Sequence, residues 1–266
     1  MQPTLADLET LARRAGEILM EGYQRRPGFG NQIKIEYKGV IDLVSEIDRR
    51  SEELLVSEIR RRFPDHHIVT EESGGFDGEG CFSWYIDPLD GTVNYLHGIP
   101  MFAVSIGVAR DRILELGVVY DPVRDECFSG ERGRGAWLNG EPIRASQAED
   151  LNHSLLVTGF PYDIRTSRRN NLNNFTRLSL LSQGVRRLGS AALDLCYTAS
   201  GRVDGYWEIS ISSWDIAAGV VIAREAGAAV STLNGDSDFL RTPTSVVAAG
   251  TPAVHRQLLK VLNEEE

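Results

Sequence analysis

The segment WYIDPLDGTVNY, residues 84–95, places two aspartates three positions apart at the end of an apolar run. Two carboxylates this close repel each other and are costly to desolvate, so a fold that brings them together usually binds a cation between them. Pro88 has no N–H to compete for the carboxylates, and Leu89 contributes a backbone carbonyl between Asp87 and Asp90. Because Mg²⁺ prefers such hard oxygen ligands, the segment predicts a magnesium site.

Further acidic residues lie at the expected ends of strands or starts of helices. Glu71 follows the strand-like HHIVT, Asp215 lies in SSWDIAAG, and Asp42 and Asp48 bound DLVSEID. However, Asp-Pro and Asp-Gly are also common turn dipeptides, and an aspartate before a helix is often only its cap. Spacing alone leaves both explanations open, because it does not show that these acids converge.

Gly91 and Thr92 open the segment that follows the aspartate pair. If this segment is helical, its first N–H groups carry partial positive charge that suits a phosphate group, and the Thr92 hydroxyl could orient a water molecule. Together with a magnesium site, these features predict metal-assisted hydrolysis of a phosphate ester. The histidines lie outside the acidic motifs, which disfavours a histidine-based mechanism.

Apolar periodicity predicts an α+β lobe over residues 1–145 and an α/β lobe over residues 146–266, joined without a flexible linker. In the first lobe we expect a helix after a Thr4–Asp7 capping box, a second helix over residues 43–63, and a hairpin that turns at Asp111. In the second lobe strands and helices alternate, and a polar helix is expected near residues 166–183.

Composition narrows the class of protein. With 42% hydrophobic and 25% charged residues in a chain of 266, the sequence is typical of a globular protein with a sizeable core. Its net charge of −10 and lack of a long basic run disfavour direct nucleic-acid binding. Three scattered cysteines indicate neither a disulfide framework nor a zinc site and favour a reducing compartment. The charged N-terminus is unlike a signal peptide, so we expect a cytoplasmic protein without membrane partners.

Five motifs in order resemble the inositol monophosphatase family of magnesium-dependent, lithium-sensitive phosphatases. They are DLVSEID, VTEES, WYIDPLDGTVNYLHGIPMFAVSIGV, GVRRLGSAALDLCYTASGRVDGYWE and WDIAAG, and they span nearly the whole chain. The resemblance implies a layered α-β-α-β-α sandwich of the sugar phosphatase type, shared with fructose-1,6-bisphosphatase, and usually a homodimer.

The resemblance also implies a site with two to three Mg²⁺ ions. Glu71, Asp87 and the Leu89 carbonyl would hold the first ion, and Asp87, Asp90 and Asp215 the second. A third, weaker ion would share Glu71. Thr92, oriented by Asp48, would position the attacking water together with Glu71.

The substrate implied by the resemblance is myo-inositol 1-phosphate or a related polyol monophosphate. The backbone N–H groups of Gly91 and Thr92 would bind the phosphate. Glu208 would accept hydrogen bonds from inositol hydroxyl groups, Asp215 would also bind the substrate, and Ser190 and Ala191 would line the same pocket. A carboxylate at Glu208 favours a neutral polyol over a second phosphate.

Other functions stay open from the sequence. Sibling activities on fructose 1,6-bisphosphate, histidinol phosphate or 3′-phosphoadenosine 5′-phosphate would keep the same acids. A regulatory protein that contacts the transcription machinery, as some bacterial relatives do, is the non-enzyme alternative. Residues 28–38, with two glycines and several polar residues, could form a lid over the site.

Overall fold

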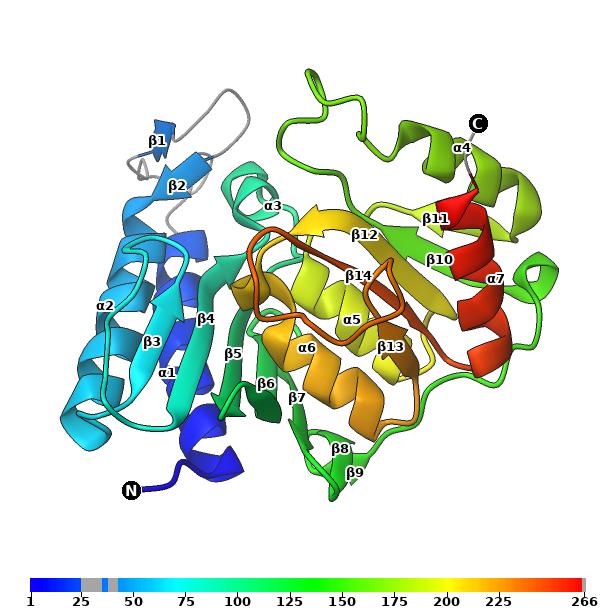
Figure 1. Ribbon diagram of the computed structural model, residues 1–266. Coiled ribbons are helices and arrows are strands. Elements are labelled where there is room, and N and C mark those ends of the chain that lie inside the picture. Colours follow the sequence, from blue (N-terminus) through cyan, green and yellow to red (C-terminus); the bar gives the residue numbers. More distant parts are fainter. Residues whose placement is uncertain (25–34, 38–42, 265–266) are drawn as a thin grey trace.

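The protein is a stack of alternating helical and sheet layers in a computed structural model that describes residues 1–24, 35–37 and 43–264 (Figure 1). Helices α1 (Leu5–Gln24) and α2 (Glu46–Arg62) cover one face of a seven-stranded sheet. Helices α5 (Ala191–Ala199) and α6 (Ser213–Glu225) lie between this sheet and a five-stranded sheet. Helices α4 (Leu172–Leu181) and α7 (Pro252–Asn263) cover the outer face of the second sheet. The predicted α-β-α-β-α sandwich is confirmed.

The first sheet follows chain order and lies within residues 67–142. Its first two strands are parallel and the others are antiparallel. Because helices cover both faces, the central strands are buried along almost their whole length. The strands are β3 (His67–Thr70), β4 (Phe82–Asp90), β5 (Ala103–Arg110), β6 (Ile113–Asp121), β7 (Glu126–Glu131), β8 (Gly135–Leu138) and β9 (Glu141–Pro142).

The second sheet is mixed and lies within residues 155–249, in the strand order β11-β10-β12-β14-β13. Its strands are β10 (Leu155–Thr158), β11 (Gly184–Arg186), β12 (Gly205–Ile211), β13 (Ala229–Ser231) and β14 (Thr244–Ala249). The short elements outside the two sheets are β1 (Ile35–Tyr37), β2 (Leu43–Ser45), α3 (Thr92–His97) and a 3-10 turn (Leu151–His153). The predicted lobe boundary at residue 145 falls between the sheets, and the division into two lobes stays a prediction.

Several expected local structures differ in their bounds. The helix expected over residues 43–63 begins at Glu46, because residues 43–45 pair with β1 as a strand. The helix expected near residues 166–183 begins only at Leu172, after Asn171, whose φ of 70° is not helical. Strand β4 continues through Asp90 instead of ending before Asp87, with an irregular register between the two aspartates. The Thr4–Asp7 capping box and the hairpin turn at Asp111 are confirmed.

Among the described residues, every helix is too short or too polar to cross a lipid bilayer.

Three glycines let α6 lie directly on the first sheet. Gly107, Gly117 and Gly130 are paired in register across β5, β6 and β7. A Cβ atom at Gly107 would lie 2.8 Å from the Ala218 nitrogen, and one at Gly130 would lie 2.9 Å from the Ile222 Cα. This close contact fixes the distance between α6 and the sheet. Asp215 lies in the first turn of α6, so the same contact helps to place it.

Replacing Gly117 by alanine should lower the free energy of unfolding by about 3 kcal/mol. The new methyl group would overlap the backbone carbonyl of Ala218, which cannot rotate away as a side chain would. Urea unfolding measures the loss. Gly74→Ala is the control, because Gly74 has a positive φ but open space around it and should cost only about 1 kcal/mol. Equal losses in the two variants would show that α6 is not fixed by this contact.

Candidate metal centre

Three acidic side chains from distant segments converge at one end of the first sheet. Glu71 follows the last residue of β3, Asp87 lies near the end of β4, and Asp215 lies in the first turn of α6. Each offers a carboxylate oxygen, and these three oxygens all lie within 4.8 Å of one another. These three acids therefore converge, which their spacing in the sequence did not show.

Burial and mutual repulsion disfavour ionisation of this cluster. Burial is the main cause that raises the pKa of Asp87 well above its ordinary value, and the charges of Glu71, Asp90 and Asp215 add to it. The pKa of Asp215 is also well above its ordinary value, mainly through burial and then through Glu71. Such a cluster is costly without a counter-charge. Three carboxylate oxygens are hard ligands, so the donor set fits Mg²⁺ rather than a soft metal.

Hydrogen bonds from the backbone hold two of these carboxylates in place. The Leu89 N–H donates to Oδ1 of Asp87 over 2.9 Å, and the Ser212 N–H donates to Oδ2 of Asp215 over 3.0 Å. The second of these bonds is half of a capping box at the start of α6. Each carboxylate keeps its other oxygen for a cation.

Helix α2 supports the cluster from one face through three residues at helical spacing. The Asp48 carboxylate accepts from Thr92, the Ser51 hydroxyl donates to the Pro88 carbonyl over 3.0 Å, and the Glu52 carboxylate accepts from the Thr70 hydroxyl and the Glu72 N–H. The last contact fixes the turn that carries Glu71. Ser51 and Glu52 were not among the site residues expected from the sequence. The signal for Glu52 is its place three and seven residues before the buried Leu55 and Ile59, on the apolar face of the helix.

Thr92 lies between a carboxylate and the predicted carbonyl ligand. Its hydroxyl is 3.0 Å from Oδ1 of Asp48 and 3.0 Å from the carbonyl oxygen of Leu89. Gly91, which precedes α3, has a φ of 91°, and a Cβ there would lie 2.8 Å from the Met101 carbonyl. A side chain at this position would therefore displace Thr92. Asp42 and most of residues 28–38 lie outside the described residues, as does any lid that they could form.

Asp90 is turned toward α5 and does not belong to the group of three converging oxygens. Its carboxylate accepts from the Ser190 hydroxyl, from the Ala192 N–H over 2.8 Å and from the Ala191 N–H over 3.3 Å. A carboxylate at a helix N-terminus is stabilised by the exposed N–H groups. The roles predicted for Asp90 as a metal ligand and for Ser190 and Ala191 in substrate binding stay predictions.

Glu208 is a buried acid on β12, and its carboxylate lies directly against Gly159. Tyr206 donates its hydroxyl proton to Oε1 of Glu208 over 3.0 Å, and burial raises the pKa of Glu208 to about 7. A Cβ atom at Gly159 would overlap this carboxylate, so the glycine makes room for it. Gly159 was not among the expected site residues, because nothing near it in the chain indicates the approach of Glu208.

A sequence model of the inositol monophosphatase family matches residues 1–266. The chain belongs to this family. The resemblance drawn from the five motifs is thereby confirmed, and the layered fold is that of solved family members.

Solved members of the family share the fold over almost their whole length. An inositol monophosphatase from Anabaena (Nostoc) sp. PCC 7120 is 40% identical, with a TM-score of 0.83 over 97% of this chain and 94% of that one. A Thermotoga maritima IMPase is 35% identical, with a TM-score of 0.84 over 97% and 96% of the two chains. The curated relative Nus factor SuhB of Pasteurella multocida is 43% identical over 97% of this chain and 95% of its own length.

Proposed function

We propose that the protein is a Mg²⁺-dependent phosphomonoesterase that hydrolyses myo-inositol 1-phosphate and related polyol monophosphates. The observation that carries the proposal is the convergence of oxygens from Glu71, Asp87 and Asp215 within 4.8 Å. Close similarity to a protein named inositol monophosphatase supports it. The carboxylates of such a cluster repel an anionic ester, so cations must lie between them for the ester to bind there.

The chain's oxygen ligands would be divided between two ions. Glu71, Asp87 and the Leu89 carbonyl would hold one, and Asp87, Asp90 and Asp215 the other, with a third, weaker ion beside Glu71. Bound Mg²⁺ would lower the pKa of a water molecule and neutralise charge on the phosphate group. The Gly91 and Thr92 N–H groups would orient that phosphate group.

Asp48 and Thr92 would position the attacking water. An ionised Asp48 only accepts hydrogen bonds, so it directs the hydroxyl proton of Thr92 toward itself. The Thr92 oxygen then has free lone pairs and accepts a hydrogen bond from the water, while Glu71 accepts a second one. Two acceptors fix the direction of the water lone pair that attacks phosphorus.

Thr92→Val should lower kcat for phosphate release about a hundredfold, because it removes the acceptor but keeps the shape of the side chain. Thr92→Ser retains the hydroxyl and should stay within about threefold of wild type. Mg²⁺ affinity, measured by calorimetry, should be the same in both variants. Equal rates for the valine and serine variants would exclude a role of the hydroxyl in positioning water.

Selection among substrates is expected to depend on Glu208, with Asp215, Ser190 and Ala191 lining the same pocket. A carboxylate there favours polyol hydroxyls and repels a second phosphate group. The test is a panel at equal concentration: myo-inositol 1-phosphate, fructose 1,6-bisphosphate, histidinol phosphate and 3′-phosphoadenosine 5′-phosphate. The proposal expects the first to be hydrolysed fastest. If Glu208→Gln left the ratio between the first two unchanged, the proposed pocket role would be wrong.

A second candidate function is a role in transcription. It is favoured by the name Nus factor SuhB, carried by relatives that are 40–43% identical over nearly the whole chain. The two functions are separable by Asp87→Asn in a transcription reaction with purified bacterial RNA polymerase. An effect on transcription that persists in this variant would be independent of hydrolysis. A partner protein that binds this chain in a fixed ratio would show a second function beside the phosphatase activity, not in place of it.

We also propose that the protein forms a homodimer, as the family resemblance implies. Two apolar side chains near the site support this, since Val93 on α3 and Ile99 just after it are 44% and 49% exposed. Sedimentation equilibrium would test it, and a monomer at micromolar concentration would contradict it.

A further inference from the structure

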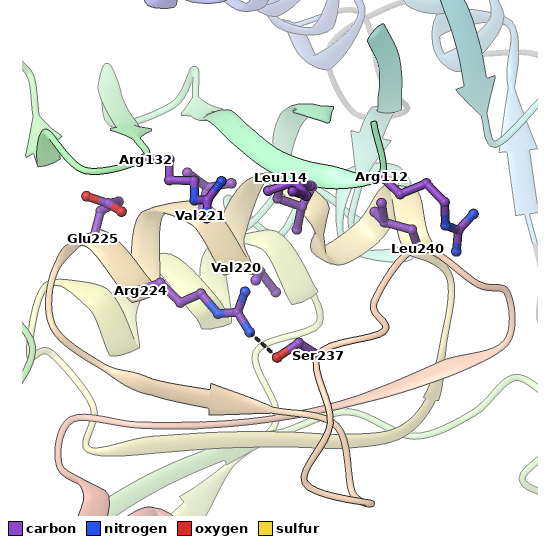
Figure 2. Close-up of a pocket in the computed structure, with 10 residues that line it drawn as sticks. Arg112, Leu114, Arg132, Val220, Val221, Arg224, Glu225, Ser237 and Leu240 are labelled. Carbon is purple, nitrogen blue, oxygen red and sulfur yellow. Dashed lines mark hydrogen bonds between the residues drawn. The ribbon is translucent and has the colours of Figure 1, made fainter. Parts of the chain in front are cut away.

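A cavity of about 230 Å³ lies beside the C-terminal half of α6, away from the acidic cluster. Its walls come from the start of β6, the turn after β7, the end of α6 and the loop before β14 (Figure 2). Arg224 is nine positions after Asp215 on α6, which corresponds to about 14 Å along the helix. The cavity is therefore separate from the candidate metal centre.

Arg224 is held in place at one wall of this cavity by contacts that leave its charge uncompensated. Its guanidinium donates to the Ser237 hydroxyl over 2.9 Å (Figure 2). The same group lies 4.8 Å from the centre of the Phe239 ring. Ser237 and Phe239 orient the group but carry no negative charge. The side chain is thus already ordered before any ligand binds, which reduces the entropic cost of binding.

Arg132, in the turn after β7, brings a second positive charge to the same end. Its charge, added to the larger effect of burial, lowers the pKa of Arg224. Within residues 1–24, 35–37 and 43–264, no acidic side chain forms an ion pair with Arg132 or Arg224. Two guanidinium groups that line the same cavity without an ion-pair partner favour a ligand with more than one negative charge.

The one carboxylate that lines the cavity is engaged by the backbone. Glu225 accepts hydrogen bonds from the N–H groups of Gly133 and Gly135, over 2.9 and 3.0 Å. It therefore fixes the turn that presents Arg132 and forms no ion pair with that guanidinium within the described residues, and its own negative charge stays at the cavity wall. At the other end of the cavity, Arg112 already contacts Asp238 at 3.4 Å, so the free positive charge is concentrated at Arg132 and Arg224.

The rest of the lining is apolar. Leu114 from β6, Val220 and Val221 from α6, and Leu240 from the loop before β14 line the cavity, with Leu240 beside Arg112 (Figure 2). A volume of about 230 Å³ accommodates a ring or short chain, not a protein segment. The ligand chemistry that fits is a doubly charged phosphate or phosphonate group joined to a small apolar body.

We propose that this cavity is a second binding site, for a small phosphorylated molecule with an apolar ring or chain. The phosphate group binds between Arg132 and Arg224, and the apolar part packs on Leu114 and Leu240. The site is independent of the proposed hydrolysis, since it uses none of the residues assigned to the metal centre.

The test is calorimetric titration of the full chain with phenylphosphonate, which has both features and no ester bond to hydrolyse. It is done at pH 8 with EDTA, so that Mg²⁺ cannot hold the anion at the acidic cluster. We expect one site, with much weaker binding of benzoate, which carries one charge, and of inorganic phosphate, which has no apolar part. Failure of phenylphosphonate to bind at about 10 mM would overturn the proposal.

Variants locate the site. Arg132→Gln and Arg224→Gln should each weaken phenylphosphonate binding about tenfold. Arg134→Gln is the matched control in the same turn. Arg134 pairs with Glu131 at 3.4 Å, does not line the cavity, and its loss should change the affinity less than twofold. Because Arg224 also stacks on Phe239, Arg132→Gln is the decisive variant, and unchanged binding in this folded variant would contradict the proposal.

Asp87→Asn separates this site from the metal centre. Phenylphosphonate affinity should be the same in this variant as in wild type, because Asp87 lies outside the cavity. Binding that changed with Asp87→Asn and not with Arg132→Gln would place the anion at the acidic cluster and overturn the proposal. Neither outcome depends on whether the protein hydrolyses any ester.

Discussion

Replacing Asp87 by asparagine is expected to abolish phosphate release and, at the same time, to make the metal-free protein more stable. Asp87 is the most buried of the three converging acids, and it lies close to Glu71 and Asp215. Without a cation, its ionised form is disfavoured by burial and by its neighbours, which is why its pKa is well above the ordinary value. An amide of the same shape removes that cost, so the free energy of unfolding in EDTA should rise by about 2 kcal/mol.

The same substitution should remove an oxygen ligand that both ions would share. Loss of several kcal/mol of charge stabilisation in the transition state corresponds to a fall of about a thousandfold or more in kcat/KM. Added Mg²⁺ should stabilise the wild-type protein by about 2.7 kcal/mol at a concentration a hundred times its Kd, and should hardly affect the variant. The order of stabilities therefore reverses between EDTA and saturating Mg²⁺.

Urea unfolding in EDTA and in Mg²⁺, together with phosphate release, measures both effects. Asp77→Asn is the matched control, because Asp77 is an exposed acid in the loop between β3 and β4. It should change neither the stability nor the response to Mg²⁺ by more than about 0.5 kcal/mol. Asp87→Asn could instead destabilise the metal-free protein as much as the Mg²⁺-bound protein. That result would show that repulsion among the carboxylates is not the reason why the cluster binds metal.

Glu208→Gln is expected to raise stability at pH 8 by about 3 kcal/mol and to leave it unchanged near pH 4.5. Burial raises the pKa of Glu208 to about 7, from an ordinary value of 4.5. The folded protein thus binds a proton at this site that the unfolded chain has already lost. Wild-type stability should therefore fall as the pH rises from 4.5 to 7, and glutamine, which is always neutral, removes this fall.

Urea unfolding of the metal-free protein between pH 4.5 and 8 compares the two profiles. The Tyr206 hydroxyl can donate to the amide oxygen as it does to Oε1 of the acid, so packing should be kept. Glu149→Gln, in the segment between the two sheets, controls for general changes of net charge. Parallel profiles for wild type and Glu208→Gln would mean that the pKa of Glu208 is the same in the folded and the unfolded protein, and would contradict the raised value.

The fold and the positions of the central acids could be predicted, because short sequence motifs that recur in a known family indicate both. The spacing of Asp87 and Asp90 and the motif around Asp215 are readable from the chain, and the family match confirms the fold. The orientation of Asp90 toward α5 was not predictable. It depends on the N-terminus of a helix about 100 residues away.

Other features depend on contacts that leave no mark on neighbouring residues. In the sequence, Gly159 cannot be told apart from any other glycine that follows a strand. Only the structure shows that the Glu208 carboxylate lies against it. The cavity at Arg132 and Arg224 joins a hairpin turn of the first sheet to the end of a helix from the second half of the chain. Arg132 and Arg224 lie in distant segments of the sequence, so sequence patterns do not indicate that they line the same cavity.

Phosphate release from myo-inositol 1-phosphate, measured in Mg²⁺ and again after EDTA, tests the central claim most directly. The three converging acids predict turnover that requires Mg²⁺, disappears with EDTA and returns when Mg²⁺ is restored. Turnover that continued in EDTA, or a protein that failed to bind Mg²⁺ at all, would contradict the metal-dependent mechanism.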